Sequence, residues 1–221
     1  MVDVQAGATS PPPPSRGGIY VHFPYCRHRC PYCDFTLTTR SRIPQGRYTD
    51  ALLAELSHLR DAWNGPRATL YIGGGTPSLW APGHLARFLE AVRQGPGLTE
   101  DAEITVEANP SEVDQPWIRR VISLGVNRVS LGVQSLRDPL LRSLERTHDA
   151  QLALASIALL KQAPLRSFSV DLIFGLEGQS LAGWREDLAQ VMELRPPHLS
   201  VYALTVEPQT PLAHRVRRGV V

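Results

Sequence analysis

The sequence predicts an α/β fold in which parallel strands alternate with helices. Three observations support this class: short apolar β-type runs recur along the chain, helical patterns separate them, and unusual residues follow the strand runs. Eight strand–helix units would close a complete barrel. Six fit into this length, so we expect an open, incomplete barrel or a doubly wound sheet.

The expected strands are apolar at most positions, which predicts a sheet covered by helices on both faces. They are residues 19–23, 69–72, 103–107, 128–131, 167–173 and 198–202. The first expected helix follows the first strand. Its apolar residues recur at helical spacing and are Tyr48, Leu52, Leu56, Leu59 and Trp63.

Two further helix starts carry capping signals. Asp138 is expected as an N-cap because Pro139 then occupies the first helical position. Ser180 is expected to cap a later helix. The apolar face of that helix would consist of Leu181, Trp184, Leu188 and Met192.

The composition limits the class of protein. The chain has 221 residues, enough for one large domain with a real core, and its net charge of +2 gives no electrostatic case for nucleic acid as a partner. No apolar run is long enough for a transmembrane segment, and no signal pattern is present. We therefore expect a cytoplasmic protein with reduced thiols. Residues 1–16 are expected to form a disordered Pro-rich leader, and residues 17–210 the core domain.

All three cysteines lie close together, at Cys26, Cys30 and Cys33, in a C-x3-C-x2-C spacing. Such crowded thiolates indicate a metal or redox centre, and three ligands on an iron–sulfur cubane would leave one iron open for a small molecule. A zinc-stabilised binding module is an alternative, with His22 or His28 as fourth ligand. Three unrelated buried thiols are the remaining possibility, because the odd count disfavours disulfides.

Polar residues and glycines follow the expected strands in turn. Gly73–Gly75 follow the second strand, Glu107 ends the third, Gln134 follows the fourth and Asp171 lies near the end of the fifth. The carboxyl ends of parallel strands form one rim, so these residues can share a cavity with the cysteines. Each also has a structural alternative as a turn or strand-end residue. Arg146 follows a short helix. Its side chain is either a surface charge or a bidentate ligand for a carboxylate.

At this point the motifs resemble a known family. C-x3-C-x2-C after a first strand resembles the signature of radical S-adenosylmethionine (SAM) enzymes. The run from Ile19 to Cys26, with Gly-Gly-Gly-Thr-Pro77 and Gly-Val-Gln-Ser135, resembles the oxygen-independent coproporphyrinogen III oxidase group. Within that group the resemblance is closest to the branch of haem chaperones called HemW. It extends from about Gly18 to the end of the chain.

The resemblance implies a partial (β/α)6 barrel of parallel strands with helices outside. It implies that Cys26, Cys30 and Cys33 bind a [4Fe–4S] cluster, with SAM on the fourth iron. The implied SAM contacts are Tyr20, Tyr32, Gly74, Gly75, Thr76, Glu107, Gln134, Arg146 and Asp171. Where the chemistry operates, an electron from the cluster cleaves SAM to methionine and a 5′-deoxyadenosyl radical. No catalytic residue is assigned.

One position separates the two branches. The resemblance implies the pattern C-x3-C-x2-C-x-C for the oxidases, with an additional cysteine two residues after the third. This chain has Phe35 at that position. This favours a haem chaperone in porphyrin metabolism over an oxidase that decarboxylates propionates. Its partners would be haem or a porphyrin, an electron donor for the cluster and an unknown haem acceptor protein. The branch carries a His-Asn-x-x-Tyr-Trp haem motif further on, and we expect residues 211–221 to begin that missing region.

Overall fold

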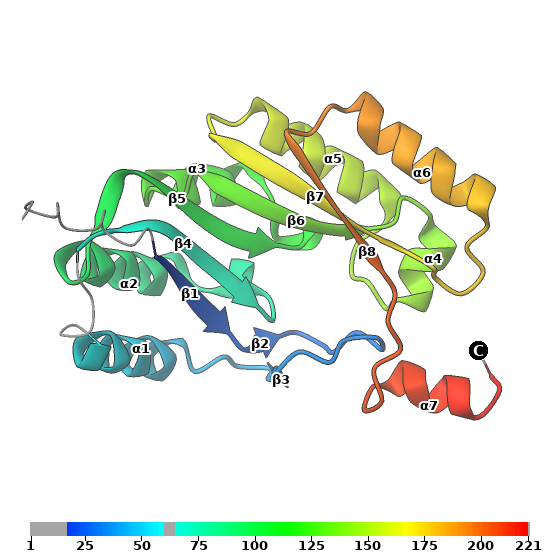
Figure 1. Ribbon diagram of the computed structural model, residues 1–221, viewed down its shortest axis with the longest axis horizontal. Helices are drawn as coiled ribbons and strands as arrows, with labels where there is room; N and C mark the ends of the chain where they lie inside the picture. Colours follow the sequence, from blue (N-terminus) through cyan, green and yellow to red (C-terminus); the bar gives the residue numbers. More distant parts are fainter. Residues whose placement is uncertain (1–16, 60–64, 221) are drawn as a thin grey trace, which may run out of the picture.

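The computed structural model describes residues 17–59 and 65–220, and Figure 1 shows its arrangement. Six parallel strands form one sheet in the order β1-β4-β5-β6-β7-β8. They are β1 (Gly18–Phe23), β4 (Arg67–Gly74), β5 (Leu98–Ala108), β6 (Arg128–Gln134), β7 (Ser167–Phe174) and β8 (His198–Ala203). All six expected strands are confirmed. The strands β1 and β8 are the unpaired edges of this sheet, as expected of an open, partial barrel.

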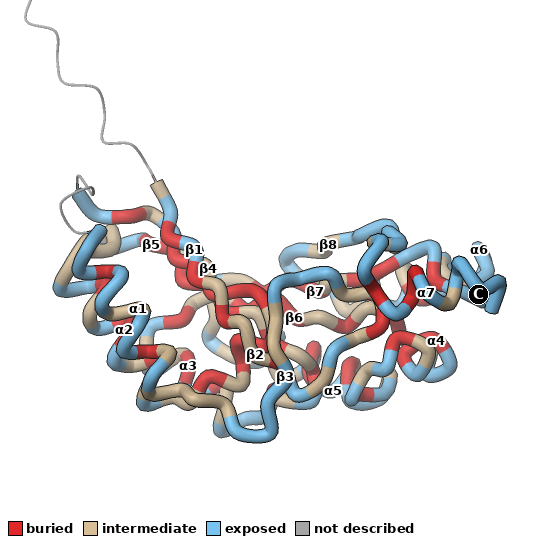
Figure 2. Tube along the Cα trace, turned by 90° about the horizontal axis from the view of Figure 1, so that it is seen from below, coloured by how far each residue is buried: buried red, intermediate tan, exposed pale blue. Residues whose placement is uncertain are grey.

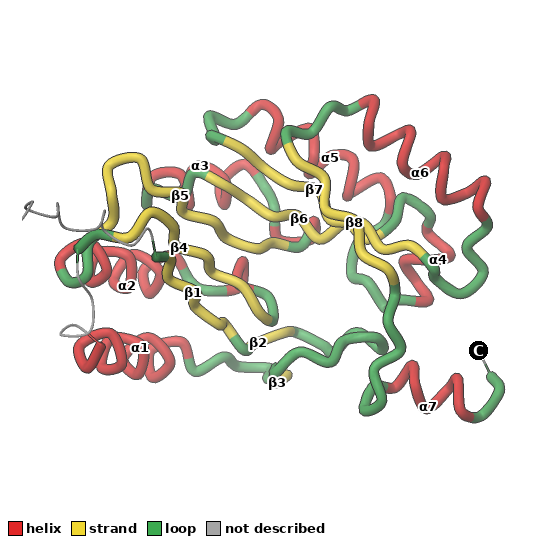
Figure 3. The backbone as a smooth tube through the Cα atoms, viewed as in Figure 1, coloured by secondary structure: helices red, strands yellow, loops and turns green. Residues whose placement is uncertain are grey.

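Helices follow the strands along the chain (Figure 3). They are α1 (Gln45–Leu59), α2 (Pro82–Gln94), α3 (Gln115–Ser123), α4 (Asp138–Ser143), α5 (Ala150–Gln162), α6 (Leu181–Glu193) and α7 (Pro211–Arg217), with the short 3-10 turns η2 (Pro77–Leu79) and η3 (Pro110–Glu112). The expected first helix is confirmed as α1; its predicted residue Trp63 and the predicted leader, residues 1–16, lie outside the described residues. No helix in the described part is long and apolar enough to cross a membrane.

The two faces of the sheet differ, so the expectation of two apolar faces is wrong. Residues such as Val21, Ile72 and Val129 are buried against the helices, and successive residues of a strand point to opposite faces. The other face therefore carries the alternate positions, and the register places Glu107 beside Ser130. In Figure 2 the buried residues follow the strands and the helix sides that face them. The sheet thus has an apolar outer face and a polar inner face.

Two buried clusters hold the helices to the outer face. One joins β1, β4 and β5 to α1 and α2, with Phe23, Leu70 and Phe88 among its fully buried members. The other joins β6 and β7 to α3, α5 and α6 around Leu131 and Ile157. A core on one side only leaves the inner face available for a ligand.

The two predicted helix starts differ in outcome. Ser180 caps α6 as expected, because its hydroxyl accepts from the N–H of Gly183. Asp138 is not an N-cap: α4 begins at Asp138, after an extended Arg137. The carboxylate of Asp138 instead accepts the N–H of Ala150, at 2.9 Å, and so satisfies the first turn of α5.

The predicted apolar face of α6 is only half right. Leu181 and Met192 are 63% and 58% exposed, and the buried face carries Asp187 and Val191. Asp187 accepts hydrogen bonds from Ser135 Oγ and Leu136 N–H and forms an ion pair with Arg137. These partners compensate the burial of its charge, so the polar network decides the helix orientation.

A short second sheet, not expected from the sequence, joins β2 (Tyr25–Cys26) to β3 (Thr38–Thr39). The N–H of Thr38 donates to the carbonyl of Pro24, at 2.7 Å, and closes the cysteine loop between them. Helix α7 is tied to the same loop, since the N–H of Leu212 donates to the carbonyl of Pro31. A division of the chain at residue 210 stays a prediction.

Candidate cofactor-binding site

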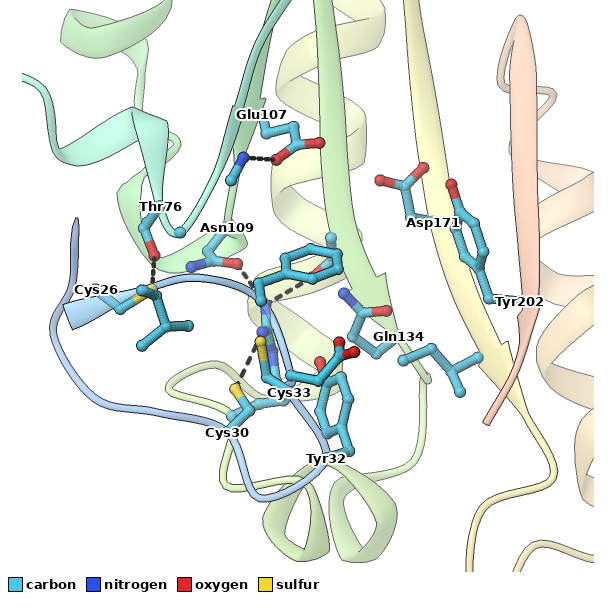
Figure 4. Close-up of a pocket in the computed structure, with 18 of the residues that line it drawn as sticks. Cys26, Cys30, Tyr32, Cys33, Thr76, Glu107, Asn109, Gln134, Asp171 and Tyr202 are labelled. Atoms are coloured by element: carbon cyan, nitrogen blue, oxygen red, sulfur yellow. Dashed lines mark hydrogen bonds between the residues drawn. The ribbon is translucent and has the colours of Figure 1, made fainter. Parts of the chain in front are cut away.

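A cavity of about 400 Å³ lies at the carboxyl ends of the strands, beneath the cysteine loop. Figure 4 shows Glu107, Gln134 and Asp171 projecting from their strands into the region that the cysteines border. The predicted residues that line the cavity are Cys26, Cys30, Tyr32, Cys33, Gly74, Gly75, Thr76, Glu107, Gln134, Arg146 and Asp171. The predicted rim thus brings Gly74, Gly75, Glu107, Gln134 and Asp171 to the cysteine loop, whereas Gly73 and Tyr20 do not line the cavity. Cofactor contact by these residues stays a prediction.

Tyr20 lies on the inner face of β1 but is not among the residues that line the cavity. Its ring stacks on Tyr71, with 6.1 Å between ring centroids, and its hydroxyl is 3.0 Å from His22 Nδ1. Its side chain is 60% exposed. Contact between Tyr20 and a cofactor stays a prediction.

The glycine run allows the chain after β4 to approach the start of the cysteine loop. The N–H of Gly75 donates to the carbonyl of Phe23 at 2.7 Å, and the N–H of Thr76 donates to that of Tyr25 at 2.9 Å. A Cβ at Gly75 would lie 2.7 Å from the Tyr25 oxygen and 3.0 Å from Cys26 Sγ. Glycine is therefore required here by close backbone approach.

Glu107 is held at the end of β5 by two donors. Tyr71 donates its hydroxyl to Oε1 at 2.7 Å, and the N–H of Gly74 donates to Oε2 at 3.0 Å. Gly74 has a φ of 113°, a conformation that favours glycine. Burial raises the pKa of Glu107, although both hydrogen bonds act in the opposite direction.

Asp171 occupies the same inner face two strands away. Its carboxylate accepts from Ser130 at 2.9 Å and from Ser169 at 3.3 Å, and burial raises its pKa. In the described part of the chain, no ion pair joins Glu107 or Asp171 to a cationic side chain. Arg128 and His22 act on these carboxylates only at longer range, so two buried carboxylates without an ion pair favour a positively charged ligand in this cavity.

Arg146 lies in the cavity wall, so its interpretation as a simple surface charge is wrong. Its Nη2 donates to Asn109 Oδ1 and, at 3.0 Å, to the carbonyl of Gly132. Its Nη1 lies 3.6 Å from Cys30 Sγ, and its Nε is buried without a partner among the described residues. The guanidinium thus connects β6 and the residue after β5 to the cysteine loop.

Gln134 departs from ordinary strand geometry. Its φ is 70°, and the register between β6 and β7 shifts between Gly132 and Gln134, as in a β-bulge. A positive φ is uncommon for a residue other than glycine and often marks a functional site. The bulge turns Gln134 toward the cavity (Figure 4).

The three thiols suit a multi-iron cluster better than a single ion. Burial raises the pKa of Cys26, and the nearby Cys30 sulfur adds to this; the pKa of Cys33 rises for the same two reasons. Such mutual disfavour of thiolates is relieved by a bound cation. Among the described residues, no three His, Cys, Asp or Glu side chains converge closely enough to hold one metal ion. A cubane binds each thiolate to a different iron, so its ligands need not converge on one point.

The zinc alternative needs four ligands around one ion, and both histidines considered for the fourth place have other hydrogen-bond partners. His22 is committed elsewhere: its Nε2 donates to the carbonyl of Thr36 at 2.6 Å, and its Nδ1 is bonded to Tyr20. The Nε2 of His28 donates to the carbonyl of Glu145. His28 Nε2 also lies 3.9 Å from Cys30 Sγ.

Several residues of the site were not predicted from the sequence. Asn109, Ser130 and Tyr202 line the cavity, and Tyr71 supports Glu107 from below. Asn109 lies two residues after the predicted site residue Glu107, and its place before Pro110 at a strand end was an available signal. Ser130 and Tyr71 needed the register between strands. Ser130 pairs with Glu107, whereas Tyr71 pairs with Thr105, two residues before Glu107 on the same face of the sheet.

Comparison with protein families gives a match to the radical SAM superfamily over residues 20–191. Among curated proteins, the chain is 39% identical over 203 residues to the haem chaperone HemW of Haemophilus influenzae, covering 89% of this chain and 53% of that protein. It is 42% identical over 194 residues to HemW of Escherichia coli, covering 87% and 51%. The mouse mitochondrial radical S-adenosyl methionine domain-containing protein 1 is 38% identical over 216 residues, covering 96% and 49%.

Comparison with solved structures agrees with these matches. The coproporphyrinogen III oxidase HemN of Escherichia coli, described as a radical SAM enzyme, aligns with a TM-score of 0.82 and 28% identity, covering 90% of this chain and 47% of that one. The methyltransferase TsrM of Kitasatospora setae, at a TM-score of 0.69 and 15% identity, shows a shared fold. The chain spans about half the length of the curated relatives it matches.

Proposed function

Because the chain belongs to the radical SAM superfamily, we propose that Cys26, Cys30 and Cys33 hold a [4Fe–4S] cluster beside a SAM site in the cavity. Membership of the superfamily implies both cofactors. When bound, the cluster offers an open iron to SAM and supplies one electron for reductive cleavage of its sulfonium. The remaining roles belong to side chains of this chain.

The charges of the cavity support SAM as the ligand. SAM carries a sulfonium and an ammonium, and Glu107 and Asp171 present two carboxylates that form no ion pair in the described part of the chain. Binding a cation there favours the ionised carboxylates, whose pKa burial raises. Arg146 counters the negative charge of the Cys30 thiolate. These residues orient the ligand, and the loop above them excludes water.

Within the superfamily, we propose that this protein serves haem delivery, as a HemW-type haem chaperone. One observation carries the proposal: the chain is 39% and 42% identical to two haem chaperones but 28% identical to the structurally similar oxidase. Phe35 at the position of an additional oxidase cysteine agrees with it. Haem or a porphyrin would be the ligand, with an electron donor and a haem acceptor protein as partners. A cytoplasmic location stays a prediction.

The alternative is an oxygen-independent coproporphyrinogen III oxidase. The TM-score of 0.82 with HemN over 90% of this chain favours it at the level of fold. The two functions share the cluster and SAM but differ in what happens to the porphyrin. An oxidase removes carboxyl groups, whereas a chaperone binds haem unchanged.

Mass spectrometry of an anaerobic reaction separates these two functions. The reaction contains the full-length, cluster-reconstituted protein, SAM, a reductant and coproporphyrinogen III. We expect no loss of carboxyl groups, together with saturable binding in a parallel haem titration. Loss of two carboxyl groups would identify an oxidase and overturn the chaperone proposal.

The cofactor assignment is tested by two substitutions. Cys30→Ala should abolish cluster assembly, because two remaining thiolates cannot hold a cubane, and this is read from the iron-to-protein ratio. Glu107→Ala should leave iron content unchanged and weaken SAM binding about tenfold by calorimetry, as expected for loss of a hydrogen bond from a charged group. Glu193→Ala, at an exposed position of α6, is the matched control. Full iron content in Cys30→Ala would refute the ligand assignment.

A further inference from the structure

The bulge at the end of β6 leaves backbone carbonyls that its neighbouring strands do not satisfy in a regular ladder. Buried carbonyl groups need donors, so the bulge persists only where other groups supply them. The carbonyl of Gly132 accepts from Arg146 Nη2 at 3.0 Å. The carbonyl of Val133 accepts from the N–H of Ser135 at 2.9 Å and from His148 Nε2 at 3.1 Å.

His148 is placed to act on the backbone and not on a ligand. It is 5% exposed and is not among the residues that line the cavity. Since a carbonyl can only accept, Nε2 of His148 carries the proton in this hydrogen bond. The ring therefore donates directly to the residue before Gln134.

The donor itself is held by its neighbours in sequence. Thr147 Oγ1 lies 2.9 Å from Ser111 Oγ, in the turn after β5. The carbonyl of Glu145 accepts from His28 of the cysteine loop, and Arg146 reaches Cys30. Consecutive residues from 145 to 148 thus contact the cysteine loop, the end of β5 and the bulge of β6.

We propose that His148 is a positioning residue for Gln134: its hydrogen bond to the Val133 carbonyl holds the bulge that turns Gln134 into the cavity. Gln134 adopts its left-handed conformation despite having a Cβ, so the conformation must be held by surrounding contacts. The inference rests on the proposed function, which places a SAM site in the cavity that Gln134 lines.

The test is a double-mutant cycle on the cluster-loaded protein, with SAM affinity and iron content as readouts. His148→Phe removes the donor and keeps a ring of similar size. We expect it to weaken SAM binding about fivefold, the loss typical of one hydrogen bond, at unchanged iron content. His148→Gln keeps an N–H donor and should restore most of the affinity. In a Gln134→Ala background, His148→Phe should add no further loss, because its effect passes through Gln134.

The outcomes separate failure of the inference from failure of the proposed site. If Gln134→Ala binds SAM as tightly as the unmodified protein, Gln134 is not a SAM contact and the inference falls with that assignment. If Gln134→Ala weakens binding but His148→Phe does not, or the two losses add in the double variant, His148 has no positioning role. Should His148→Phe fail to load the cluster, His148→Asn, whose amide is too short to reach the carbonyl, replaces it in the same cycle.

Discussion

Glu107, Asp171 and Cys26 lie where burial raises the pKa of each group and so disfavours its charged form. His148 shows the opposite sign for the same reason, because burial, and then Arg146, lower its pKa to about 4. At the scale of single residues, burial therefore favours the neutral form of each of these four side chains. A cation bound at this site would favour the charged forms of Glu107, Asp171 and Cys26, whereas His148 is neutral at pH 7 and donates a hydrogen bond.

His148 should make stability fall in acid. Its pKa is about 4 in the folded protein and about 6.5 in the unfolded chain, so the unfolded state binds more protons between these values. The contribution of neutral His148 to the free energy of unfolding is complete above pH 6.5, the pKa in the unfolded chain. It is lost as the pH falls toward about 4, the pKa in the folded protein. Between pH 7 and pH 5 we expect His148 to account for a loss of about 2 kcal/mol in the free energy of unfolding.

Urea unfolding at both pH values, in the unmodified protein and in His148→Gln, measures this contribution. The carboxylates titrate in both proteins, so the difference between the two pH dependences isolates the imidazole. Identical pH dependences would show that His148 has no depressed pKa.

At the scale of elements, the cysteine loop is held by the edge of the barrel. The turn after β4 donates two backbone hydrogen bonds to the end of β1 and the start of the loop, and Thr76 donates its hydroxyl to Cys26 Sγ at 3.3 Å. This contact requires the absence of a side chain at Gly75. The position of the first cysteine thus depends on the glycine run of the next strand.

Gly75→Ala should therefore displace the cysteine loop. Its methyl group would meet the Tyr25 carbonyl at 2.7 Å and the Cys26 sulfur at 3.0 Å, and overpacking of this kind costs about 1–3 kcal/mol. We expect a lower urea midpoint and a reduced iron-to-protein ratio. Gly83→Ala in α2 is the matched control, because a Cβ there meets open space. Equal iron loading in the two variants would contradict the close contact.

At the scale of the whole molecule, the cavity depends on both halves of the sheet. Glu107 and Tyr71 belong to strands of the first buried cluster, whereas Gln134 and Asp171 belong to strands of the second. A ligand in the cavity touches both halves and the cysteine loop at once. Its binding free energy therefore adds to the stability of the entire fold.

SAM at about 100 times its Kd should stabilise the cluster-loaded protein by roughly 2.7 kcal/mol, since it binds only the folded state. Anaerobic urea unfolding with and without SAM measures the shift. Cys30→Ala, without a cluster, should show a much smaller shift at the same SAM concentration. An equal shift in Cys30→Ala would mean that SAM binding does not depend on the cluster.

The sequence predicted the local features well because their causes are local. Strand positions followed from apolar runs, the Ser180 cap from its own hydroxyl, and the cysteine group from spacing within one loop. The rim arrangement followed from the rule that parallel strands end on the same side. The sequence did not predict which face of α6 is buried or that α4 begins at Asp138. Both depend on hydrogen bonds that Asp187 and Asp138 accept from residues distant in the sequence.

By itself, the sequence determined the family of the chain, the order of its strands and helices, and the residues that gather at the carboxyl ends of the sheet. Only the tertiary structure decided that the inner face is polar, that Tyr71 and Ser130 support the two carboxylates, and that Arg146 and His148 hold the bulge at Gln134. The physical reason is that these roles arise from hydrogen bonds across the sheet. Such bonds depend on strand register and loop approach, which spacing along the chain does not specify.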